Sequence, residues 1–325
     1  MGVIRAVVKG CGHYLPERVV ENEEFTKTLD TSDEWIRART GIERRHFAAD
    51  DQKTSDLAFE AASMALKNAG MTGADLDAIV LATATPDQTF PSTATRLQHA
   101  IGMTGGFAFD LQAVCAGFIY SLANATALIE SGHAKTVMVV GAETFSRIID
   151  FTDRGTCVLF GDGAGALILQ AEESDGTSED RGVLSTDLNS DGKYNDLLYV
   201  DGGVSSTGTT GLLRMEGQEV FKHAVSKLAS SGEKALALAG LTASDIDWIV
   251  PHQANLRIIK RTAKKMGVSM DNVVVTVQDH GNTSAASIPL ALSVAVERGQ
   301  IKKGDLLLLE AIGGGLAWGA AAVRW

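Results

Sequence analysis

An internal repeat constrains the fold of this 325-residue chain more than any other feature of its sequence. The segment GMTGADLDAIVLATATP begins at Gly70, and a second segment, GLTASDIDWIVPHQA, begins at Gly240. Both contain Gly-x-Thr, two Asp residues at matching positions and an Ile-Val pair, and both follow an Ala-rich run with helical spacing. A chance match between two common helix–strand segments is the alternative. A duplication predicts two similar halves related by a pseudo-twofold axis, with a site where the halves meet.

Further segments match at about the same offset. KTVMVVGAE begins at residue 135, and GDLLLLEAI begins at residue 304. Such uninterrupted runs of apolar, mostly branched residues are typical of strands in a sheet that is covered on both faces. Because the runs alternate with helical patterns several turns long, they indicate βα units. The sequence therefore predicts an α/β protein made of two halves, residues 1–170 and 171–325.

Composition and charge exclude several classes of function. The net charge of −11 argues against the basic surface that nucleic-acid binding requires. Three cysteines, Cys11, Cys115 and Cys157, are too few and too scattered for a disulfide framework. The start of the chain has no apolar core of a signal peptide, and no long apolar segment is free of charge and glycine. We expect a soluble cytoplasmic protein with no metal cluster, no nucleic acid and no membrane partner.

Three polar residues lie where predicted strands give way to helices. Cys115 follows the strand pattern FAFDLQAV and opens a helical one, a position that favours a thiolate nucleophile. His252 ends the strand of the second repeat, and Asn282 lies in a Gly-rich turn. Taken singly, each is as well explained as a small buried residue or a turn residue. Together they predict a site, because open α/β sheets place their sites at strand ends.

The order Cys, His, Asn also occurs in papain-like cysteine proteases. The signature that surrounds the protease cysteine is absent around Cys115, and the chain lacks a secretory signal and a set of disulfides. A protease would also leave the repeat unexplained. We therefore set this interpretation aside.

At these residues the sequence resembles β-ketoacyl-acyl carrier protein synthase III, the condensing enzyme that initiates dissociated fatty acid synthesis, over essentially the whole chain. The resemblance rests on TSDEWIRARTGIERRH (31–46), TFPSTA (89–94), CAGF (115–118), TDRGT (152–156), FGDGAGA (160–166), PHQANLRI (251–258), HGNTSAAS (280–287) and GGGLAWGAA (313–321). It implies the thiolase fold, a five-layered αβαβα arrangement of two pseudo-twofold related halves with mixed sheets. The repeat agrees with this fold independently.

The resemblance also implies the chemistry. Cys115 is expected to take an acyl group from acyl-CoA as a thioester in a ping-pong reaction. His252 and Asn282 are expected to stabilise the enolate that forms when the malonyl thioester loses CO2. The backbone N–H groups of Cys115 and Gly314 are expected to form the other oxyanion hole, since glycine lets a backbone amide approach a thioester closely. Acyl-CoA is then a substrate, and no cofactor is expected.

Further roles carry over from the same motifs. Trp35, Arg39, Arg154 and Asn255 match positions that the family uses to bind CoA. Phe90 matches an aromatic residue that reaches the acyl pocket of the neighbouring subunit, which implies a homodimer. Ile312 and Leu316 stand where close relatives often have aromatic residues, so the preference for a particular acyl primer does not carry over.

One predicted helix concentrates positive charge in an acidic chain. In NLRIIKRTAKKMG, helical spacing places the apolar residues on one side and five cations on the other: Arg257, Lys260, Arg261, Lys264 and Lys265. A solvated helix face is the simpler interpretation. The resemblance favours docking of the acidic acyl carrier protein at Arg257, Arg261, Lys264, Lys265 and the nearby Lys222, by charge complementarity.

The resemblance thus implies an acyltransferase that condenses a short acyl-CoA, most simply acetyl-CoA, with malonyl-acyl carrier protein. The products are 3-ketoacyl-acyl carrier protein, CO2 and CoA. One alternative is a relative from secondary metabolism that uses a longer or branched acyl group. Another is a catalytically silent paralogue that only binds, which the intact Cys115, His252 and Asn282 argue against.

Overall fold

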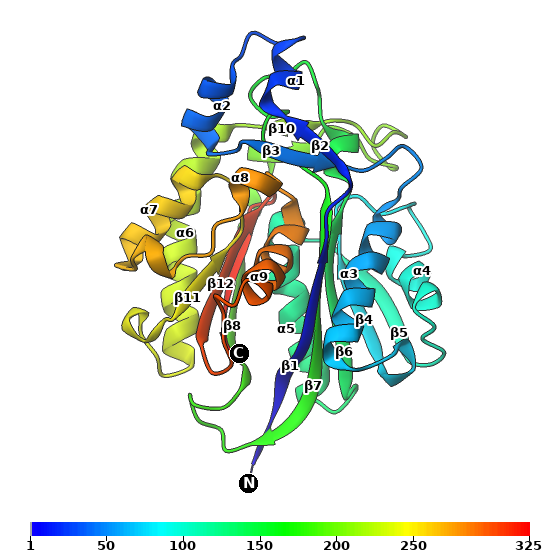
Figure 1. Cartoon of the computed structure of the whole chain (residues 1–325), viewed down its shortest axis with the longest axis vertical. Helices are drawn as coiled ribbons and strands as arrows, with labels where there is room; N and C mark the ends of the chain where they lie inside the picture. The colour runs from blue at the N-terminus through cyan, green and yellow to red at the C-terminus, as the bar shows by residue number, and fades with distance from the viewer. Residues whose placement is uncertain (1) are drawn as a thin grey trace.

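The computed structural model describes residues 2–325, and these form five alternating layers of helices and sheets. In Figure 1 the layers run from α6 and α7 on one side, through a sheet, the central helices α5 and α9 and a second sheet, to α3 and α4 on the other side. Both termini lie in the lower half of Figure 1, with the N-terminus at its bottom tip. This arrangement is the predicted αβαβα fold.

The first sheet has five strands and the second has four, and both are mixed. The first has the spatial order β1 (Val3–Tyr14), β7 (Gly163–Ser174), β6 (Thr136–Glu143), β4 (Ala78–Ala82) and β5 (Phe107–Leu111). The second has the order β8 (Gly182–Ser190), β13 (Ala317–Arg324), β12 (Leu306–Gly313) and β11 (Trp248–Pro251). In the first sheet β4 is parallel to both of its neighbours, β5 and β6, and in the second sheet β11 is parallel to β12. All other neighbouring strands in these two sheets are antiparallel.

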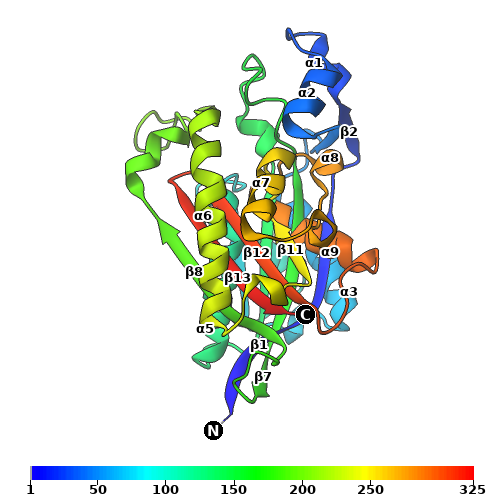
Figure 2. The same ribbon diagram turned by 90° about the vertical axis from the view of Figure 1, so that its left-hand side faces the viewer.

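The helices fill three layers. The outer layer on the first sheet holds α3 (Thr54–Ala69) and α4 (Thr93–Ala100), and the outer layer on the second holds α6 (Gly217–Leu238) and α7 (Leu256–Met266). The central layer holds α5 (Gly117–Glu130) and α9 (Ser287–Glu297), which contact strands of both sheets. Figure 2 shows α6 and α7 lying across the outer face of the second sheet.

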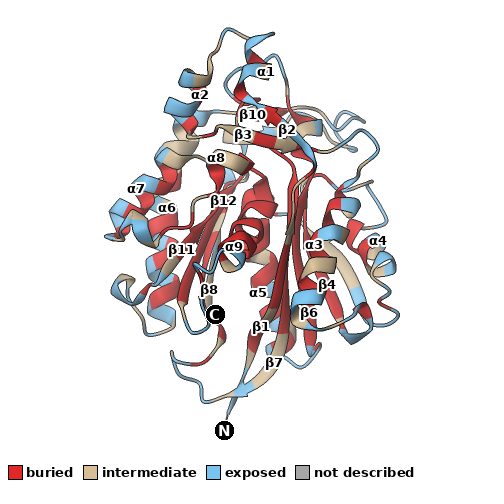
Figure 3. Ribbon diagram, in the orientation of Figure 1, coloured by how far each residue is buried: buried red, intermediate tan, exposed pale blue. Residues whose placement is uncertain are grey.

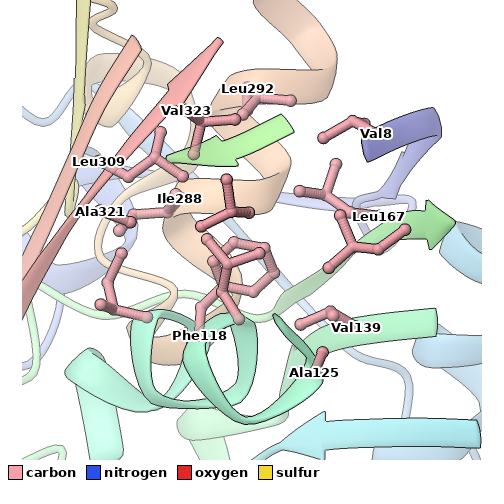
Figure 4. Close-up of a cluster of buried hydrophobic side chains, with 14 of the residues drawn as sticks. Val8, Phe118, Ala125, Val139, Leu167, Ile288, Leu292, Leu309, Ala321 and Val323 are labelled. Atoms are coloured by element: carbon pink, nitrogen blue, oxygen red, sulfur yellow. The ribbon is translucent and has the colours of Figure 1, made fainter. Parts of the chain in front are cut away.

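Successive side chains of β12 point to opposite faces of the sheet, and both faces are covered by apolar clusters. Leu307 and Leu309 belong to the central core, whereas Leu306 and Leu308 pack in the cluster under α6 and α7. In the close-up of Figure 4, Leu309 of β12, Leu167 of β7 and Phe118 of α5 meet in this central core. Figure 3 shows α9 buried over most of its length, while the outer helices are exposed on their outward sides. A strand covered on both faces needs apolar residues at every position.

The duplication is visible element by element. The short 3₁₀ turns η1 (Gly73–Asp75) and η5 (Ala243–Asp245) are separated by the offset of the sequence repeat, and so are β6 and β12 from end to end. The second half lacks a fifth strand. At the place that corresponds to β5, the chain makes a single parallel bridge, between Val273 and Ile249 of β11.

The division of the chain at residue 170 stays a prediction. Residue 170 lies inside β7, and the chain passes from the first sheet to the second between the end of β7 and the start of β8. A boundary within residues 175–181 would leave both sheets intact.

Smaller elements form a cap over one end of the layers, at the top of Figure 1. They are α1 (Asn22–Thr26), α2 (Asp33–Thr40), the hairpin of β2 (Arg18–Glu21) with β3 (Arg44–Phe47), and the hairpin of β9 (Leu198–Val200) with β10 (Leu213–Met215). The buried Arg45 fastens the cap, since it donates to Val20 O, Asn22 Oδ1 and Val158 O. Gly41 ends α2 in a left-handed conformation with φ of 78° and packs against Leu256 of α7.

Within residues 2–325, no helix combines the length and the apolar character needed to cross a membrane.

Gly141 of β6 provides a test of how tightly the halves meet. A Cβ at this position would overlap the carbonyl group of Ala285, at the start of the central α9 layer. We expect Gly141→Ala to lower the free energy of unfolding by about 1–3 kcal/mol, as overpacked cores do. Urea denaturation measures the change. Gly105→Ala is the control, because a Cβ there meets nothing within 4 Å. Equal midpoints for both variants would contradict a tight contact.

Candidate active site

Cys115 lies at the start of the central helix α5, in the 3₁₀ turn η2 (Val114–Ala116). The preceding Val114 has φ of 48°, which is unusual for a β-branched residue and forces a sharp turn between β5 and α5. The side chain is buried, with 3% of the residue exposed. Burial raises the pKa of the Cys115 thiol to about 12, and the nearby Ser284 hydroxyl acts in the opposite direction.

The second half repeats this turn at the start of α9. Ser284 corresponds to Val114 at the offset of the repeat, begins the 3₁₀ turn η7 (Ser284–Ala286) and has φ of 50°. Its backbone N–H donates to Asn282 Oδ1 over 2.9 Å, while Asn282 N donates to Leu159 O over 2.9 Å. The amide of the buried Asn282 is therefore held with its oxygen occupied, which leaves its NH2 group to donate to a ligand.

His252 follows the last residue of β11 and is 4% exposed. Its backbone N–H donates to Glu310 O over 2.7 Å, and its Nδ1 lies 2.5 Å from Ser287 Oγ at the first residue of α9. Burial lowers the pKa of the imidazole to about 3, so the ring is neutral at physiological pH. A neutral imidazole whose Nδ1 accepts from Ser287 can donate from Nε2.

The glycine run of residues 313–315 lies against the turn that holds Cys115. A Cβ on Gly313 would stand 2.6 Å from Cys115 N and 3.1 Å from Ala116 N. One on Gly314 would stand 2.6 Å from Leu198 O. Only glycine permits this approach of two backbones. The run therefore brings the Gly313 backbone beside Cys115, whereas Gly314, the residue predicted for the oxyanion hole, lies against Leu198.

The structure brings the four predicted CoA-binding residues together at the cap. The Arg39 and Arg154 guanidinium groups lie 4.6 Å and 4.9 Å from the centre of the Trp35 ring. Asn255 Nδ2 donates to Arg39 O over 3.1 Å, and Asn255 Oδ1 caps α7 at Arg257 N. Trp35 itself is placed by Ser32, whose Oγ accepts from the Trp35 N–H at the start of α2.

The predicted docking cations form one surface on α6 and α7. Every one of them is exposed: Lys222, Arg257, Arg261, Lys264 and Lys265. Arg257 and Arg261 lie over the Phe221 ring at 5.7 Å and 5.0 Å, so α6 and α7 present their charges together. The opposite side of α7 carries the buried Ile259, Ala263 and Met266, as helical spacing predicts.

A cavity of about 1180 Å³ adjoins the turn η2 at Val114, the residue before Cys115. Its walls include Val114, Phe145, Ile148, Leu198 and Gly314, with residues of the β9–β10 hairpin among them. Phe90 is 80% exposed and lies outside this cavity wall. Ile312 and Leu316 are buried in a cluster with residues of α6 and α7.

Three buried residues of this region were not singled out from the sequence: Ser284, Ser287 and Glu143. Both serines lie within HGNTSAAS, whose Asn282 alone was assigned a role. Glu143 is the one charged residue in the strand TVMVVGAE, at its very end. A buried charge is rarely kept without a partner or a function, so this lone Glu was a usable signal.

A fold of two similar halves, with a cysteine, a histidine and an asparagine converging where the two central helices begin, defines a condensing enzyme of the thiolase class. Comparisons with known proteins agree. Family profiles described as 3-oxoacyl-[acyl-carrier-protein] synthase III and its C-terminal part match residues 109–192 and 236–325. This chain belongs to the 3-oxoacyl-[acyl-carrier-protein] synthase III family, the condensing enzymes that initiate fatty acid biosynthesis.

Individual relatives support the assignment over the full length. The chain is 71% identical to the beta-ketoacyl-[acyl-carrier-protein] synthase III of Ruegeria sp. (strain TM1040), over 99% of each chain. The crystal structure of the corresponding synthase III from Aquifex aeolicus VF5 superposes with a TM-score of 0.92 at 43% identity, covering 98% of this chain and 100% of that one. The enzyme from Pseudomonas aeruginosa PAO1 gives the same TM-score and identity, covering 99% and 98%.

Glu310, which accepts the His252 N–H through its backbone, offers a test of burial behind the site. Burial raises the pKa of its carboxyl from 4.5 to about 8. Between pH 4.5 and 8 the folded state therefore keeps a proton that the unfolded state has already released. The free energy of unfolding falls as pH rises through this window. We expect Glu310→Gln to reduce this fall by up to about 1.4 kcal/mol per pH unit. Urea denaturation across pH 5–8 measures it, with the exposed Glu60→Gln as control. An unchanged slope would contradict a protonated Glu310.

Proposed function

We propose that this enzyme condenses a short acyl-CoA, most simply acetyl-CoA, with malonyl-acyl carrier protein, in two steps. In the first step Cys115 attacks the acyl-CoA carbonyl, releases CoA and keeps the acyl group as a thioester. In the second step malonyl-acyl carrier protein loses CO2, and its enolate attacks the acyl-enzyme to give 3-ketoacyl-acyl carrier protein. The reaction uses no cofactor, since acyl-CoA is consumed as a substrate.

The observation that carries this proposal is the neutral, donor-oriented pair of His252 and Asn282. Loss of CO2 supplies the electrons of the enolate, so no base has to remove a proton from carbon. The step needs hydrogen-bond donors aimed at the oxygen that becomes negative. The imidazole is held neutral by burial, which lowers its pKa, with Nδ1 at Ser287. The amide oxygen is held by the Ser284 N–H, so both side chains keep a donor for that oxygen.

A second set of donors serves the first step. The backbone N–H groups of Cys115 and Gly314 stabilise the oxyanion of the tetrahedral intermediate at the acyl carbonyl. The close contact of Gly313 with Cys115 N supports this assignment, because it fixes the glycine run against the nucleophile. Fixed backbone dipoles need no reorganisation during the reaction.

The cap binds CoA. The Trp35 ring stacks with the adenine, and Arg39 and Arg154 contact the phosphates, for which guanidinium groups are well suited. The two guanidinium groups already lie against the Trp35 ring, and Asn255 ties α7 to the backbone of Arg39. This arrangement places a flat aromatic surface and two positive charges on one side of the cap.

The enzyme acts as a homodimer in a reducing compartment, the cytoplasm. Phe90 and Phe107 are large apolar residues that are exposed, and Phe107 lies on β5 at the edge of the first sheet. Exposed apolar groups and open sheet edges mark surfaces that another chain covers. Phe90 then reaches the acyl pocket of the partner subunit. Within the described part of the chain the three cysteines are unbridged, which suits a reducing compartment.

Mass spectrometry of the intact protein tests the nucleophile and the acyl donor. After mixing with acetyl-, isobutyryl- or octanoyl-CoA, we expect an acetyl adduct that is absent in Cys115→Ala. An adduct formed only with a branched or long acyl group would support the proposed mechanism but favour the alternative function, a secondary-metabolism enzyme that uses such an acyl group. No adduct with any donor would contradict the proposed first step.

Variants of His252 and Asn282 separate the two steps. We expect His252→Ala and Asn282→Ala to form the acetyl adduct but to release 14CO2 from malonyl-acyl carrier protein on the order of 100- to 1000-fold more slowly, as expected for loss of an oxyanion donor. If either variant condensed at the wild-type rate, its assigned role would be wrong.

The basic surface on α6 and α7 docks the acidic carrier protein, and charge reversal tests this. We expect Arg261→Glu with Lys265→Glu to raise KM for malonyl-acyl carrier protein by about tenfold, which corresponds to about 1.4 kcal/mol. The salt dependence of kcat/KM should weaken, because these charges mainly steer association. The control is Lys303→Glu, an exposed cation outside this surface. Acetylation by acetyl-CoA should stay unchanged in all of these variants. A KM that did not respond would place docking elsewhere.

A further inference from the structure

Glu143 is buried beside the nucleophile, and the reaction described above gives it no role. Its carboxyl ends β6 and accepts from Thr85 Oγ1 over 2.6 Å and from Thr83 Oγ1 over 3.2 Å. The Ala84 N–H donates to both carboxyl oxygens, over 3.2 Å and 3.1 Å. These donors come from the segment after β4 and stabilise a carboxylate in the interior, at a considerable cost in desolvation.

Ser284 begins the turn η7, which packs against both η2, the turn that holds Cys115, and β6, the strand that ends at Glu143. Its hydroxyl is buried and has no full hydrogen bond among the described residues. It nevertheless lies close enough to both groups to lower the pKa of Cys115 and that of Glu143. A hydroxyl can accept a proton from one side and donate its own to the other. A buried hydroxyl without a hydrogen bond lowers stability, so the presence of Ser284 at this position indicates a function.

The first step of the reaction leaves a proton without an acceptor. Cys115 must lose its proton to become a strong nucleophile, and burial, which raises the pKa of the thiol, opposes the thiolate. His252 is a poor acceptor, because its Nδ1 is engaged with Ser287 and burial lowers the pKa of its ring. The start of α5 favours negative charge at Cys115, but a helix terminus cannot take up a proton.

We propose that Ser284 relays the proton of Cys115 to the Glu143 carboxylate when the thiol attacks acyl-CoA. The inference deepens the proposed function, on which it rests. The S–H bond breaks as Ser284 Oγ accepts that proton, while the hydroxyl proton of Ser284 passes to a Glu143 oxygen. The sulfur electron pair forms the new bond to the acyl carbon. When the C–S bond to CoA breaks, the proton returns from Glu143 through Ser284 to the departing CoA sulfur, so atoms and charges balance.

The surroundings of Glu143 suit this exchange. Burial raises the pKa of its carboxyl to about 7, and the hydroxyls of Thr85, Ser284 and Thr83 with the Ala84 N–H limit the rise. The titratable group that faces it is the Cys115 thiol, whose own pKa the Glu143 charge raises. A general base is most effective when its pKa lies near the working pH.

The test is the pH dependence of Cys115 alkylation by iodoacetamide, followed by mass spectrometry of the intact protein. For the wild-type enzyme we expect a rate that rises with pH through about 7, the pKa of Glu143, as this group becomes a carboxylate. In Glu143→Gln that limb should disappear, and the rate at a working pH of about 7.5 should fall on the order of 100-fold, the contribution typical of a general base. Glu143→Asp should keep the limb with a reduced rate.

Ser284→Gly should show the same loss as Glu143→Gln, and the double variant should lose little more, because both changes interrupt one path. Glycine accepts φ of 50° without strain, and the backbone N–H that holds Asn282 remains. Thr85→Val removes a donor to the carboxylate and should move the limb to higher pH. Ser121→Ala is the matched control, since it removes another buried hydroxyl without a partner among the described residues, further along α5 from Cys115.

A Ser284→Gly variant with the wild-type pH profile would overturn the relay. So would a Glu143→Gln variant that loses reactivity while Ser284→Gly keeps it. Release of CO2 from a malonyl thioester needs His252 and Asn282 but no thiol proton, so it should stay within about threefold of wild type in folded variants. A variant that loses both Cys115 alkylation and CO2 release is misfolded. In that case Thr85→Val decides: a shift of the alkylation limb to higher pH supports the relay, and no shift contradicts it. Alkylation uses no acyl substrate, so a wrong assignment of the acyl donor would leave this result unaffected.

Discussion

The structure depends on a contact between backbones at its pseudo-twofold axis, where the starts of α5 and α9 meet the ends of the central strands. Gly117 of α5 and Gly141 of β6 both approach Ala285, and Gly313 of β12 approaches the backbone of Cys115. The three glycines themselves present no side chain at these points. Because each half closes on the other through glycine, the polar side chains at the helix starts are brought into one small, buried volume.

Burial of the polar groups in that volume is unfavourable, and the hydrogen bonds of His252 and Glu143 explain their protonation states. Burial lowers the pKa of His252, which keeps it neutral, and raises the pKa of Glu143 to about 7, near its point of half-ionisation at physiological pH. Hydrogen-bond donors from residues 83–85 stabilise the charged form of Glu143, whereas the Ser287 hydroxyl at Nδ1 of His252 is compatible with a neutral ring. In the proposed mechanism, differences in local hydrogen bonding thus separate a group that exchanges a proton from one that donates a fixed hydrogen bond.

The sequence predicted the fold class and the meeting of the halves, because the repeat and the apolar strands report directly on layered packing. It also predicted which residues converge, since strand ends and helix starts are local features. It did not predict Ser284, Ser287 or Glu143 as parts of the site. Their partners lie far away in the chain, as between Glu143 and Thr85 or between Ser287 and His252, so no local pattern reveals them. The sequence also did not predict that the second half lacks a fifth strand. The segment at Val273 is as apolar as a strand, but it pairs with β11 at one residue only.

The pseudo-symmetry relates the proposed two-step reaction to the two copies of the duplicated unit. At the offset of the repeat, Cys115 corresponds to Ala285, Ala82 to His252, Gln112 to Asn282 and Glu143 to Gly313. Each of these positions differs in its chemistry between the two halves, so the charges and donors do not duplicate. Two copies of the cysteine would crowd the axis, and two copies of the glutamate would place a second carboxylate where Gly313 must approach Cys115 N. In the proposed reaction the first half therefore supplies the nucleophile and the buried carboxylate, and the second supplies the neutral donors. Ser284, whose hydroxyl stands where the first half has the apolar Val114, begins the turn η7, which packs against both the turn of Cys115 and the strand that ends at Glu143.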